Sequence, residues 1–436
     1  MPPVWRKWCV VAVLWRLLVV LFLSTVYAVR LALRCAWRIV VGIGSIEEVL
    51  GEEGAALCEA LGPTFIKVGQ ILSCRPDLLG AGTASPLARL QHQLSPFGSR
   101  SVKRCLSESY PAPISEIFHR FDLDPLWAAS IAQVHRARLK DGTEVAVKIR
   151  RPGVVQTVHR DFQIARWIGR ALESVPLLKA APICDVTREV FELITQQLDF
   201  RREADNYRRF RASFRGQERI RFPRVFDEFS TESILVLEFM DGLRKVTDPE
   251  LSASQRAALA RTGLRLLYKM IFVDGFVHAD MHPGNVFVRR GDLVVLDVGM
   301  TAVLSGQERE EFANFFFGIV NHDGKECARV ILDTAAICAN SFDRSAFEAA
   351  MEDLVARHSS LRSRDFEVPR FVFELMAIQH RFGVRGSTRF ITTVLAMVVF
   401  DGICKQLHPE CDFLAEARGF LIVARYSSSA VSQKSR

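Results

Sequence analysis

The chain has 436 residues, 49% of them hydrophobic and 24% charged, which excludes an intrinsically disordered protein and predicts two or three domains or lobes. The net charge of +8 suits a surface that meets anionic lipid or phosphorylated ligands. It is too diffuse to indicate nucleic acid, and no RNA- or DNA-binding signature or zinc-finger spacing occurs. The ten cysteines include no C-x-x-C pair, so a reduced, cytosol-facing compartment is the simpler interpretation.

The first predicted element is an apolar helix. The segment Trp8 to Val29 has one charge, Arg16, in 22 residues, and about 20 apolar residues suffice to span a bilayer. Arg30, Arg34 and Arg38 follow at helical spacing, which is unusual after a signal peptide. We expect a single-pass membrane anchor that leaves the bulk of the chain cytoplasmic, or facing the interior of an organelle. An interfacial helix, a cleaved signal and a soluble helix are the alternatives.

Helices broken by glycine and proline follow, from Ser45 to about residue 94. From about Phe121 the pattern becomes mixed. Glu144–Ile149 alternates apolar and polar residues after an Asp-Gly turn, and Ser233–Phe239 is a buried-strand candidate. The stretch between these strands, Val154 to Phe214, is mostly helical in pattern.

The second half of the chain is typical of a helical domain with a few short strands. Ser252 with Gln255, and Ser305 with Glu308, form capping boxes that predict two helix starts. Leu293–Gly299, "LVVLDVG", predicts a short strand that enters a turn. The final ten residues read as a polar tail.

These elements predict an α+β protein with two lobes around a cleft. The expected segments are an N-terminal membrane helix (1–41), a helical extension (45–120), a strand-containing N-lobe (121–241), a helical C-lobe (242–415) and a C-terminal tail (416–436).

Lys148 lies on the strand "VAVK" and is a candidate phosphate ligand. A lysine that points into a protected space needs an anionic partner, because burying an unpaired ammonium is costly. Glu203, on a helix expected to pack against that strand, is the best candidate. An outward-facing lysine on an edge strand is the alternative.

The stretch "GFVHADMHPGNVFV" places Asp280 and Asn285 five residues apart. This interval is typical of a kinase catalytic loop, in which the aspartate orients the acceptor hydroxyl and the asparagine holds a metal. Pro283 and Gly284 would turn the chain so that the asparagine returns towards the aspartate. We expect His278 to brace the loop by hydrogen bonds.

Asp297 leaves the strand "LVVL" into a glycine turn, with room to bind Mg²⁺, which prefers hard oxygen ligands. An ordinary turn aspartate is the alternative. Lysine, glutamate, Asp-x4-Asn and Asp-x-Gly occur in the order that phosphoryl transfer from ATP requires. We therefore expect Lys148, Asp280, Asn285 and Asp297 to converge on one divalent cation and one triphosphate in a protein-kinase-like fold.

These motifs resemble the UbiB/AarF/ADCK atypical kinase-like family, which is linked to ubiquinone biosynthesis. The resemblance runs from about Ala55 to Ala415. Phe65–Leu79 looks like the family's KxGQ extension, and Pro125–Ala137 like the alanine-rich loop that replaces a glycine-rich phosphate loop. The resemblance implies Mg²⁺ and ATP as cofactors, and ATPase activity more than protein phosphorylation.

The resemblance also implies residue roles. Lys148 and Glu203 would form an ion pair beside the catalytic Asp280, while Asn285 and Asp297 hold metal. The implied nucleotide-binding residues are Ala128, Ala129, Ser130, Lys148, Glu238 and Met240, and those of the regulatory extension are Lys67, Gln70 and Asp199.

Two positions depart from the family pattern. Gln197 stands where the family carries a glutamate, so Asp199 would have to pair with Lys67, or the extension is held less tightly. Val298 stands where phenylalanine is usual, which weakens the expected packing against the helix of Glu203. The family's C-terminal transmembrane hairpin is not expected here.

A basic stretch, Arg201 to Arg224, contains nine arginines. It is either a contact for anionic membrane lipid or a solvated helix face and loop. Three functions remain open: a membrane-anchored ATPase or kinase in quinone or lipid metabolism, partnered by quinone-precursor biosynthesis proteins; a nucleotide-binding pseudokinase scaffold; and a conventional protein kinase. The KxGQ helix and Ala279, where many kinases have arginine, speak against the last.

Overall fold

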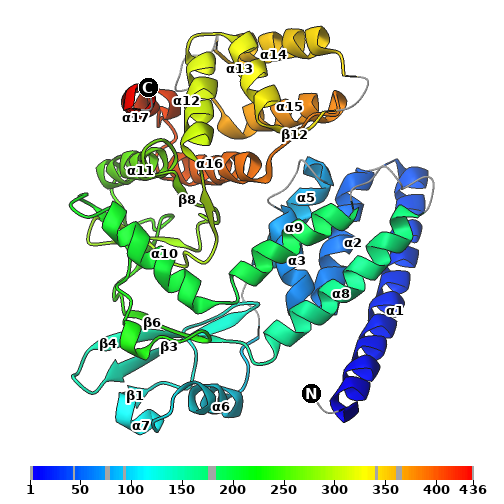
Figure 1. The fold of residues 1–436 in the computed structure, drawn as a ribbon, viewed down its shortest axis with the longest axis vertical. Coiled ribbons are helices and arrows are strands. Elements are labelled where there is room, and N and C mark those ends of the chain that lie inside the picture. Colours follow the sequence, from blue (N-terminus) through cyan, green and yellow to red (C-terminus); the bar gives the residue numbers. More distant parts are fainter. Residues whose placement is uncertain are drawn as a thin grey trace. The chain divides into compact units, whose positions relative to one another are not determined.

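The computed structural model describes residues 3–42, 45–73, 79–91, 95–174, 183–338, 342–359 and 366–434. The chain forms two compact units (Figure 1). Unit 1 comprises Met1–Ala204 and Val225–Phe239, and unit 2 comprises Asp205–Arg224 and Met240–Arg436. Both mix helices with sheet, which confirms the predicted α+β class. The boundary at Phe239 lies close to the predicted lobe boundary after residue 241, and unit 1 also takes in the N-terminal helices.

Unit 1 contains one antiparallel sheet, in the order β1-β3-β4-β6, with β2 paired to β3. Its strands are β1 (Phe118–Phe121), β2 (Trp127–Ala128), β3 (Ala132–Leu139), β4 (Glu144–Arg150) and β6 (Ile234–Glu238). The predicted Asp-Gly turn joins β3 to β4, with Gly142 at φ 88° and the Thr143 N–H donating to Asp141 Oδ1 over 2.9 Å. Because side chains alternate along a strand, Val145, Val147 and Ile149 all enter the core, and Lys148 faces the other side.

Two groups of helices complete unit 1. Val102 and Leu106 of α6 (Ser99–Ser109) pack into the sheet core beside α7 (Ile114–Ile117). The second group contains α1 (Pro3–Val41), α2 (Ile46–Leu61), α3 (Pro63–Ser73), α5 (Ala81–Leu87), η1 (Ala88–Gln91), α8 (Val154–Glu173) and α9 (Ile183–Gln196); the short η2 (Asp227–Phe229) precedes β6. The predicted break at Gly62-Pro63 is therefore confirmed.

Helix α1 is longer than the apolar segment predicted from sequence, because no proline or glycine interrupts residues 4–41. Val13 and Val20 pack on Leu61 of α2 and Ile164 of α8. Arg16 donates from Nε to Asp161 Oδ1 of α8 over 2.7 Å. The opposite face leaves large apolar side chains exposed, among them Trp15, Leu18, Phe22, Leu33 and Trp37.

Unit 2 is mainly helical. Its helices are α11 (Ala253–Tyr268), the π-helical turn η3 (Lys269–Asp274), α12 (Gly306–Val320), α13 (Gly324–Asp333), α14 (Arg344–Ser359), α15 (Val368–Arg381), α16 (Thr388–Leu407) and α17 (Phe413–Lys434). The helix α10 (Phe200–Ser213) begins in unit 1 and continues into unit 2. Both predicted capping boxes are present, at the starts of α11 and α12.

Short strands cross unit 2. They form the sheet β5-β10-β9-β7 and the pairs β11-β8 and β12-β13. Their bounds are β5 (Ile220–Arg221), β7 (Arg244–Lys245), β8 (Phe276–His278), β9 (Val286–Arg289), β10 (Asp292–Val295), β11 (Thr301–Val303), β12 (Ala335–Ile337) and β13 (Arg385–Gly386). The hairpin β9–β10 separates the predicted catalytic loop from the predicted metal loop.

Two helices are long and apolar enough to cross a membrane, judged by length and composition among the described residues: α1 over Val11–Val41 and α16 over Arg389–Leu407. The window of α16 is 72% buried, which is typical of a core helix. The expected polar tail is helical as far as Lys434, because no proline or glycine after Gly419 stops α17.

Candidate active site

Lys148 and Glu203 form a buried ion pair within unit 1. The Lys148 Nζ donates to both carboxylate oxygens of Glu203, over 2.8 and 2.9 Å, and the two residues are 8% and 3% exposed. The Phe200 ring lies 5.4 Å from the Nζ. The predicted partner is therefore confirmed, and the outward-facing alternative for Lys148 is wrong.

The alanine-rich loop connects β2 to β3, and Ala128 and Ser130 in it are buried. Its backbone is held by Arg151, a residue that the sequence analysis missed. The Arg151 guanidinium donates to the carbonyls of Ala129 and Ser130, each over 3.2 Å, and to that of Ser95 over 3.1 Å. Burial lowers the pKa of Arg151. Its place directly after β4, before a Pro-Gly turn, was the available signal.

Glu238 and Met240, the other predicted nucleotide-binding residues, lie at and just beyond the end of β6. Glu238 pairs with Val145 of β4 in the sheet, and both predicted residues are half-buried. The unit boundary falls between them, so Glu238 belongs to unit 1 and Met240 to unit 2. Their contact with nucleotide stays a prediction.

The loop between β8 and β9 in unit 2 carries Asp280 and Asn285. The Asn285 Nδ2 donates to the Asp280 carbonyl over 2.9 Å, so the asparagine returns to the aspartate as predicted. The Asp280 N–H donates to His278 Nδ1 over 3.1 Å, which confirms the bracing hydrogen bond. His278 is fully buried, and this burial lowers its pKa, so the ring is neutral at pH 7.

Asp297 follows β10 and has a backbone φ of 50°. Residues other than glycine seldom adopt this left-handed conformation, and such strain gathers at functional sites. The Asp297 N–H donates to the Tyr207 hydroxyl of α10 over 2.9 Å, and the Gly299 N–H donates to Asp297 Oδ1 over 3.3 Å. The Asp297 side chain is exposed while its backbone is held, an arrangement suited to a ligand of a cation.

Val298, next in this loop, is fully buried, and its carbonyl accepts from Asn206 Nδ2 over 2.8 Å. Two polar contacts from α10, Asn206 and Tyr207, thus hold the loop in unit 2. The strength of an active-inactive switch with valine here stays a prediction.

The donor set of unit 2 fits Mg²⁺. The Asn285 Nδ2 is used as a donor, which leaves the amide oxygen for a cation, and the Asp297 carboxylate is a second hard oxygen ligand. Within the described residues, no cluster of three His, Cys, Asp or Glu could hold a metal alone. Two protein ligands suffice for Mg²⁺, which completes its shell with phosphate oxygens and water. Lys148 belongs to the other unit, so its convergence with these residues stays a prediction.

Lys67 and Gln70 of the KxGQ segment lie in α3, and residues 74–78 of that segment are outside the described residues. Gln70 Nε2 donates to the Leu90 carbonyl over 2.7 Å. Gly69 packs closely, since a Cβ there would lie 2.3 Å from Leu90 Cδ1, and the Leu90 side chain would have to move to make room for it. Lys67 is half-buried and makes no hydrogen bond or ion pair with a described residue. The extension is therefore fastened here by packing.

Neither Gln197 nor Asp199, the two positions of the family's acidic motif, contacts Lys67 among the described residues. The Asp199 carboxylate accepts from the Arg201 N–H over 3.0 Å, at the start of α10. Gln197 is 6% exposed, and its Nε2 has no hydrogen-bond partner in the part of the chain that the structure describes. Among the described residues, the expected replacement pair between Asp199 and Lys67 does not form.

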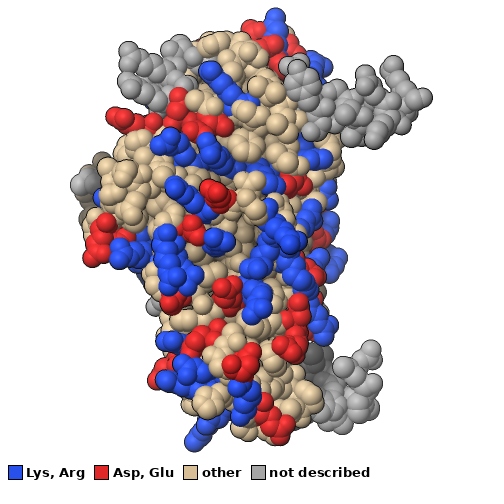
Figure 2. Space-filling model, turned by 90° about the vertical axis from the view of Figure 1, so that its left-hand side faces the viewer, with Lys and Arg blue, Asp and Glu red and all other residues tan. Residues whose placement is uncertain are grey.

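The nine arginines between Arg201 and Arg224 are all exposed. Several contact their own unit: Arg208 pairs with Asp205 over 2.7 Å, and Arg221 with Asp292 over 2.8 Å. Figure 2 shows basic and acidic side chains interleaved on one face of the molecule. The pairing favours the solvated-face interpretation for these two arginines, and membrane contact by the others stays a prediction.

Comparison with known proteins agrees with these motifs. A family model described as the ABC1 atypical kinase-like domain matches residues 89–331. The "Probable protein kinase UbiB" of Pseudomonas fluorescens (strain Pf0-1) is 32% identical over 383 residues, 86% of this chain and 71% of that protein. The protein of the same name from Vibrio parahaemolyticus serotype O3:K6 (strain RIMD 2210633) is 30% identical over 384 residues, 86% of this chain and 70% of that protein.

A solved structure shows the same fold. It is the complex of Rv3197 with erythromycin from Mycobacterium tuberculosis, with a TM-score of 0.57 at 23% identity. The match covers 80% of this chain and 90% of that chain.

Proposed function

Since the chain belongs to the ABC1 atypical kinase-like family, we propose that it is a membrane-associated kinase or ATPase that uses ATP and Mg²⁺ and supports ubiquinone or related isoprenoid-lipid metabolism. The observation that carries the enzymatic part is the Asp280–Asn285 loop, closed by its own hydrogen bond beside the strained Asp297. Polar groups held in place before the substrate arrives are what phosphoryl transfer requires of a protein.

Each predicted residue has a role in this proposal. The Lys148 ammonium, oriented by Glu203, neutralises phosphate oxygens. The Asp280 carboxylate accepts the proton of the attacking hydroxyl or water. Asn285 and Asp297 would hold Mg²⁺, which supplies charge neutralisation on the phosphates. Arg151 stiffens the alanine-rich loop through its contacts with the Ala129 and Ser130 carbonyls and acts on nucleotide only through that loop.

The test is ATP hydrolysis by the purified chain, with and without liposomes of anionic lipid. We expect slow turnover that needs Mg²⁺ and falls about a hundredfold or more in Asp297→Asn, because the metal loses a charged ligand. Asp292→Asn is the matched control. Asp292 lies at the start of β10, the strand that precedes Asp297, and it pairs with the exposed Arg221. Equal turnover in Asp297→Asn and the parent would remove the enzymatic assignment.

A non-catalytic scaffold is the second candidate, and Gln197 and Val298 favour it, because each replaces a residue that the family pattern carries at that position. Thermal-shift measurements with Mg-ATP, run beside the hydrolysis assay, separate the two. A nucleotide-dependent rise in Tm without turnover, even on anionic liposomes, would select the scaffold.

Membrane attachment is proposed to occur through α1. Its exposed face is apolar, but Arg16, within the segment expected to span, pairs with Asp161 of the charged helix α8. Arg34 likewise pairs with Glu52 and Glu53 of α2. A spanning α1 would have to break the first pair or carry it into lipid, so the structure favours the interfacial alternative.

Protease digestion of tags on both ends of the membrane-bound chain tests this topology. An interfacial α1 leaves both tags on the same side of sealed vesicles. Protection of the N-terminal tag alone would select the spanning anchor.

A further inference from the structure

Helices α3, α8 and α9 of unit 1 enclose two adjoining hollows that the proposed ATP chemistry does not use. The first is a cavity of about 160 Å³ lined by apolar side chains of all three helices, such as Val68, Val158 and Val190. The second, about 340 Å³, lies between α8 and α9. Phe162 and Phe191 line both, with stacked rings whose centroids are 3.7 Å apart. The two hollows therefore lie next to each other and share this aromatic pair as a common wall.

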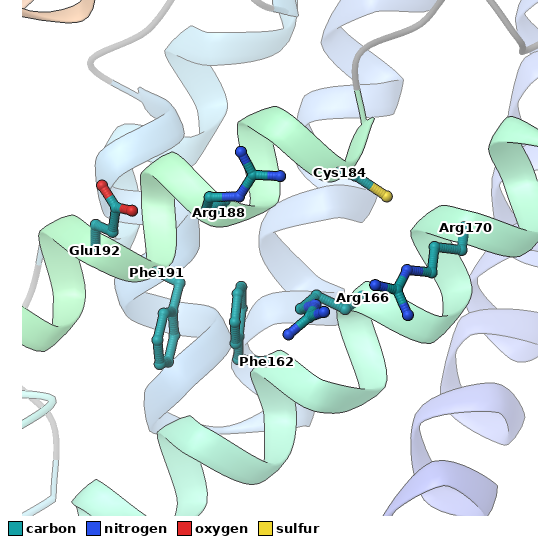
Figure 3. A pocket seen from close by; sticks show the side chains of 7 residues that line it. All are labelled: Phe162, Arg166, Arg170, Cys184, Arg188, Phe191 and Glu192. Carbon is teal, nitrogen blue, oxygen red and sulfur yellow. The ribbon is translucent and has the colours of Figure 1, made fainter.

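The second hollow, named the arginine mouth, carries a cluster of cations. Figure 3 shows Arg166 beside the Phe162 ring, Arg170 further along α8, and Arg188 on α9. Glu192 also lines it, so the lining carries three guanidinium groups and one carboxylate. Guanidinium groups match the oxygens of phosphate with paired hydrogen bonds.

The contacts of Arg166 and Arg188 leave these two side chains available to an anion. Arg188 pairs with Asp185 over 3.3 Å, but both side chains are more than 60% exposed, and such pairs exchange readily. The Arg166 guanidinium lies 5.7 Å from the centre of the Phe162 ring, which orients it at the junction of the two hollows. The mouth is thus suited to an anion joined to an apolar group.

Three polar side chains line the cavity: Asp161, whose carboxylate pairs with Arg16, Thr187, whose hydroxyl donates to the Ile183 carbonyl, and Thr64. Thr64 is 5% exposed and lines the cavity, and its Oγ1 has no hydrogen-bond partner among the described residues. Burying a hydroxyl without a partner is costly, so it is expected to bond a ligand atom. An apolar cavity of roughly 150 Å³ holds a group about the size of benzene. The cavity therefore takes a short apolar body with room for one polar atom.

The inner end of this cavity adjoins the helix proposed to meet the membrane. Asp161 and Phe65 line the cavity, and both contact Arg16 of α1: the Asp161 carboxylate over 2.7 Å, and the Phe65 ring with its centroid 5.8 Å from the guanidinium carbon. A ligand that partitions into membrane would thus be concentrated beside its site.

We propose that the cavity and the arginine mouth together form a binding site for an anionic amphiphile, with its apolar body in the cavity and its phosphate among Arg166, Arg170 and Arg188. Binding at this site requires no nucleotide, so it goes beyond the proposed ATP chemistry and can be tested without it.

The experiment measures binding of hexyl phosphate to the full chain in nonionic detergent, without nucleotide, by isothermal titration calorimetry. We expect saturable binding at one site, weakened about tenfold or more by Arg166→Ala and by Arg188→Ala, because each removes charge-assisted hydrogen bonds. Hexanol and inorganic phosphate, the two halves of the probe, should each bind at least about tenfold more weakly.

Two variants test the cavity itself. Ala165→Phe fills it and should abolish binding. Because that variant could fail to fold, Thr64→Val, which keeps the side-chain volume, provides a second reading, with a loss of a few-fold. Arg160→Ala is the matched control, since Arg160 lies on α8 but lines neither hollow.

Unchanged affinity in both arginine variants would overturn the proposal, as would inorganic phosphate binding as tightly as hexyl phosphate. Competition by phosphatidylglycerol vesicles, but not phosphatidylcholine vesicles, would assign the site to membrane phospholipid; no competition by either would assign it to a soluble alkyl phosphate. Repeating the titration with Asp297→Asn separates this site from the ATP chemistry, because binding should persist there.

Discussion

Two lysines of unit 1 occupy contrasting surroundings. Lys148 is buried and donates to both oxygens of Glu203, whereas Lys67 is half-buried and contacts no carboxylate among the described residues. The buried Gln197 Nε2 likewise has no hydrogen-bond partner among the residues that the structure describes. The difference teaches that charge holds the predicted catalytic pair in one geometry, while close helix packing holds the extension.

The largest expected effect comes from breaking the Lys148–Glu203 pair. Glu203→Gln leaves a buried ammonium without its counter-charge, and we expect the free energy of unfolding to fall by about 3–5 kcal/mol. Denaturant unfolding in detergent measures the change. Asp292→Asn, which breaks the more exposed pair with Arg221, should cost at most about 1 kcal/mol.

The double variant Lys148→Met with Glu203→Leu sharpens this prediction. It removes both charges and should recover most of the lost stability without restoring ATP hydrolysis. If Glu203→Gln alone has the same free energy of unfolding as the parent, the Lys148–Glu203 pair does not stabilise the fold as its burial indicates.

The packing of the extension is tested on helix α2. A Cβ at Gly51 would lie 2.4 Å from the Thr83 carbonyl oxygen of α5, so Gly51→Ala should destabilise the chain by about 1–3 kcal/mol. Gly54→Ala on the same helix has its nearest neighbour at 4.0 Å and should stabilise by about 0.5–1 kcal/mol. Thermal unfolding of the Gly51→Ala and Gly54→Ala variants compares the two positions. Equal changes in stability would contradict the close packing inferred at Gly51.

The catalytic loop adds a pH dependence. Burial lowers the pKa of His278 in the folded chain, while the unfolded value is about 6.5. Above that pH both states are neutral and the stability is full; below it the unfolded chain takes a proton that the folded chain refuses, so the free energy of unfolding falls.

The free energy of unfolding, measured from about pH 7.5 to about pH 5 so that the range brackets the unfolded pKa of about 6.5, checks this dependence. His278→Gln should reduce the loss of unfolding free energy as the pH falls. His119→Gln, at an exposed position, should leave that loss unchanged. Burial also lowers the pKa of His135, so a residual slope is expected in both variants. If the free energy of unfolding depends on pH as steeply in His278→Gln as in the parent, His278 is not buried as a neutral ring.

The smallest effects are expected at Gln197 and Lys67. Gln197→Met removes a buried amide whose Nε2 has no hydrogen-bond partner among the described residues, and it should raise the free energy of unfolding by about 1 kcal/mol. Lys67→Met, which removes a charge held by no described partner, should change it by less than about 0.5 kcal/mol. A large loss in Lys67→Met would reveal an ion pair and remove the contrast with Lys148.

The sequence by itself determined the features that depend on near neighbours along the chain. The Asp280–Asn285 turn, the Asp-Gly hairpin and both capping boxes follow from residue types a few positions apart, since their hydrogen bonds close within the motif. The alternation around Lys148 likewise predicted which side chains enter the sheet core.

Tertiary structure alone decided the contacts between distant segments. The Arg151 contacts that hold the alanine-rich loop, the Arg16–Asp161 pair and the hollows among α3, α8 and α9 depend on how helices pack. So does the failure of Gln197 and Asp199 to meet Lys67 among the described residues. Local pattern indicates which face of an element is apolar, but the partner is selected by the combined fit of all the packed side chains.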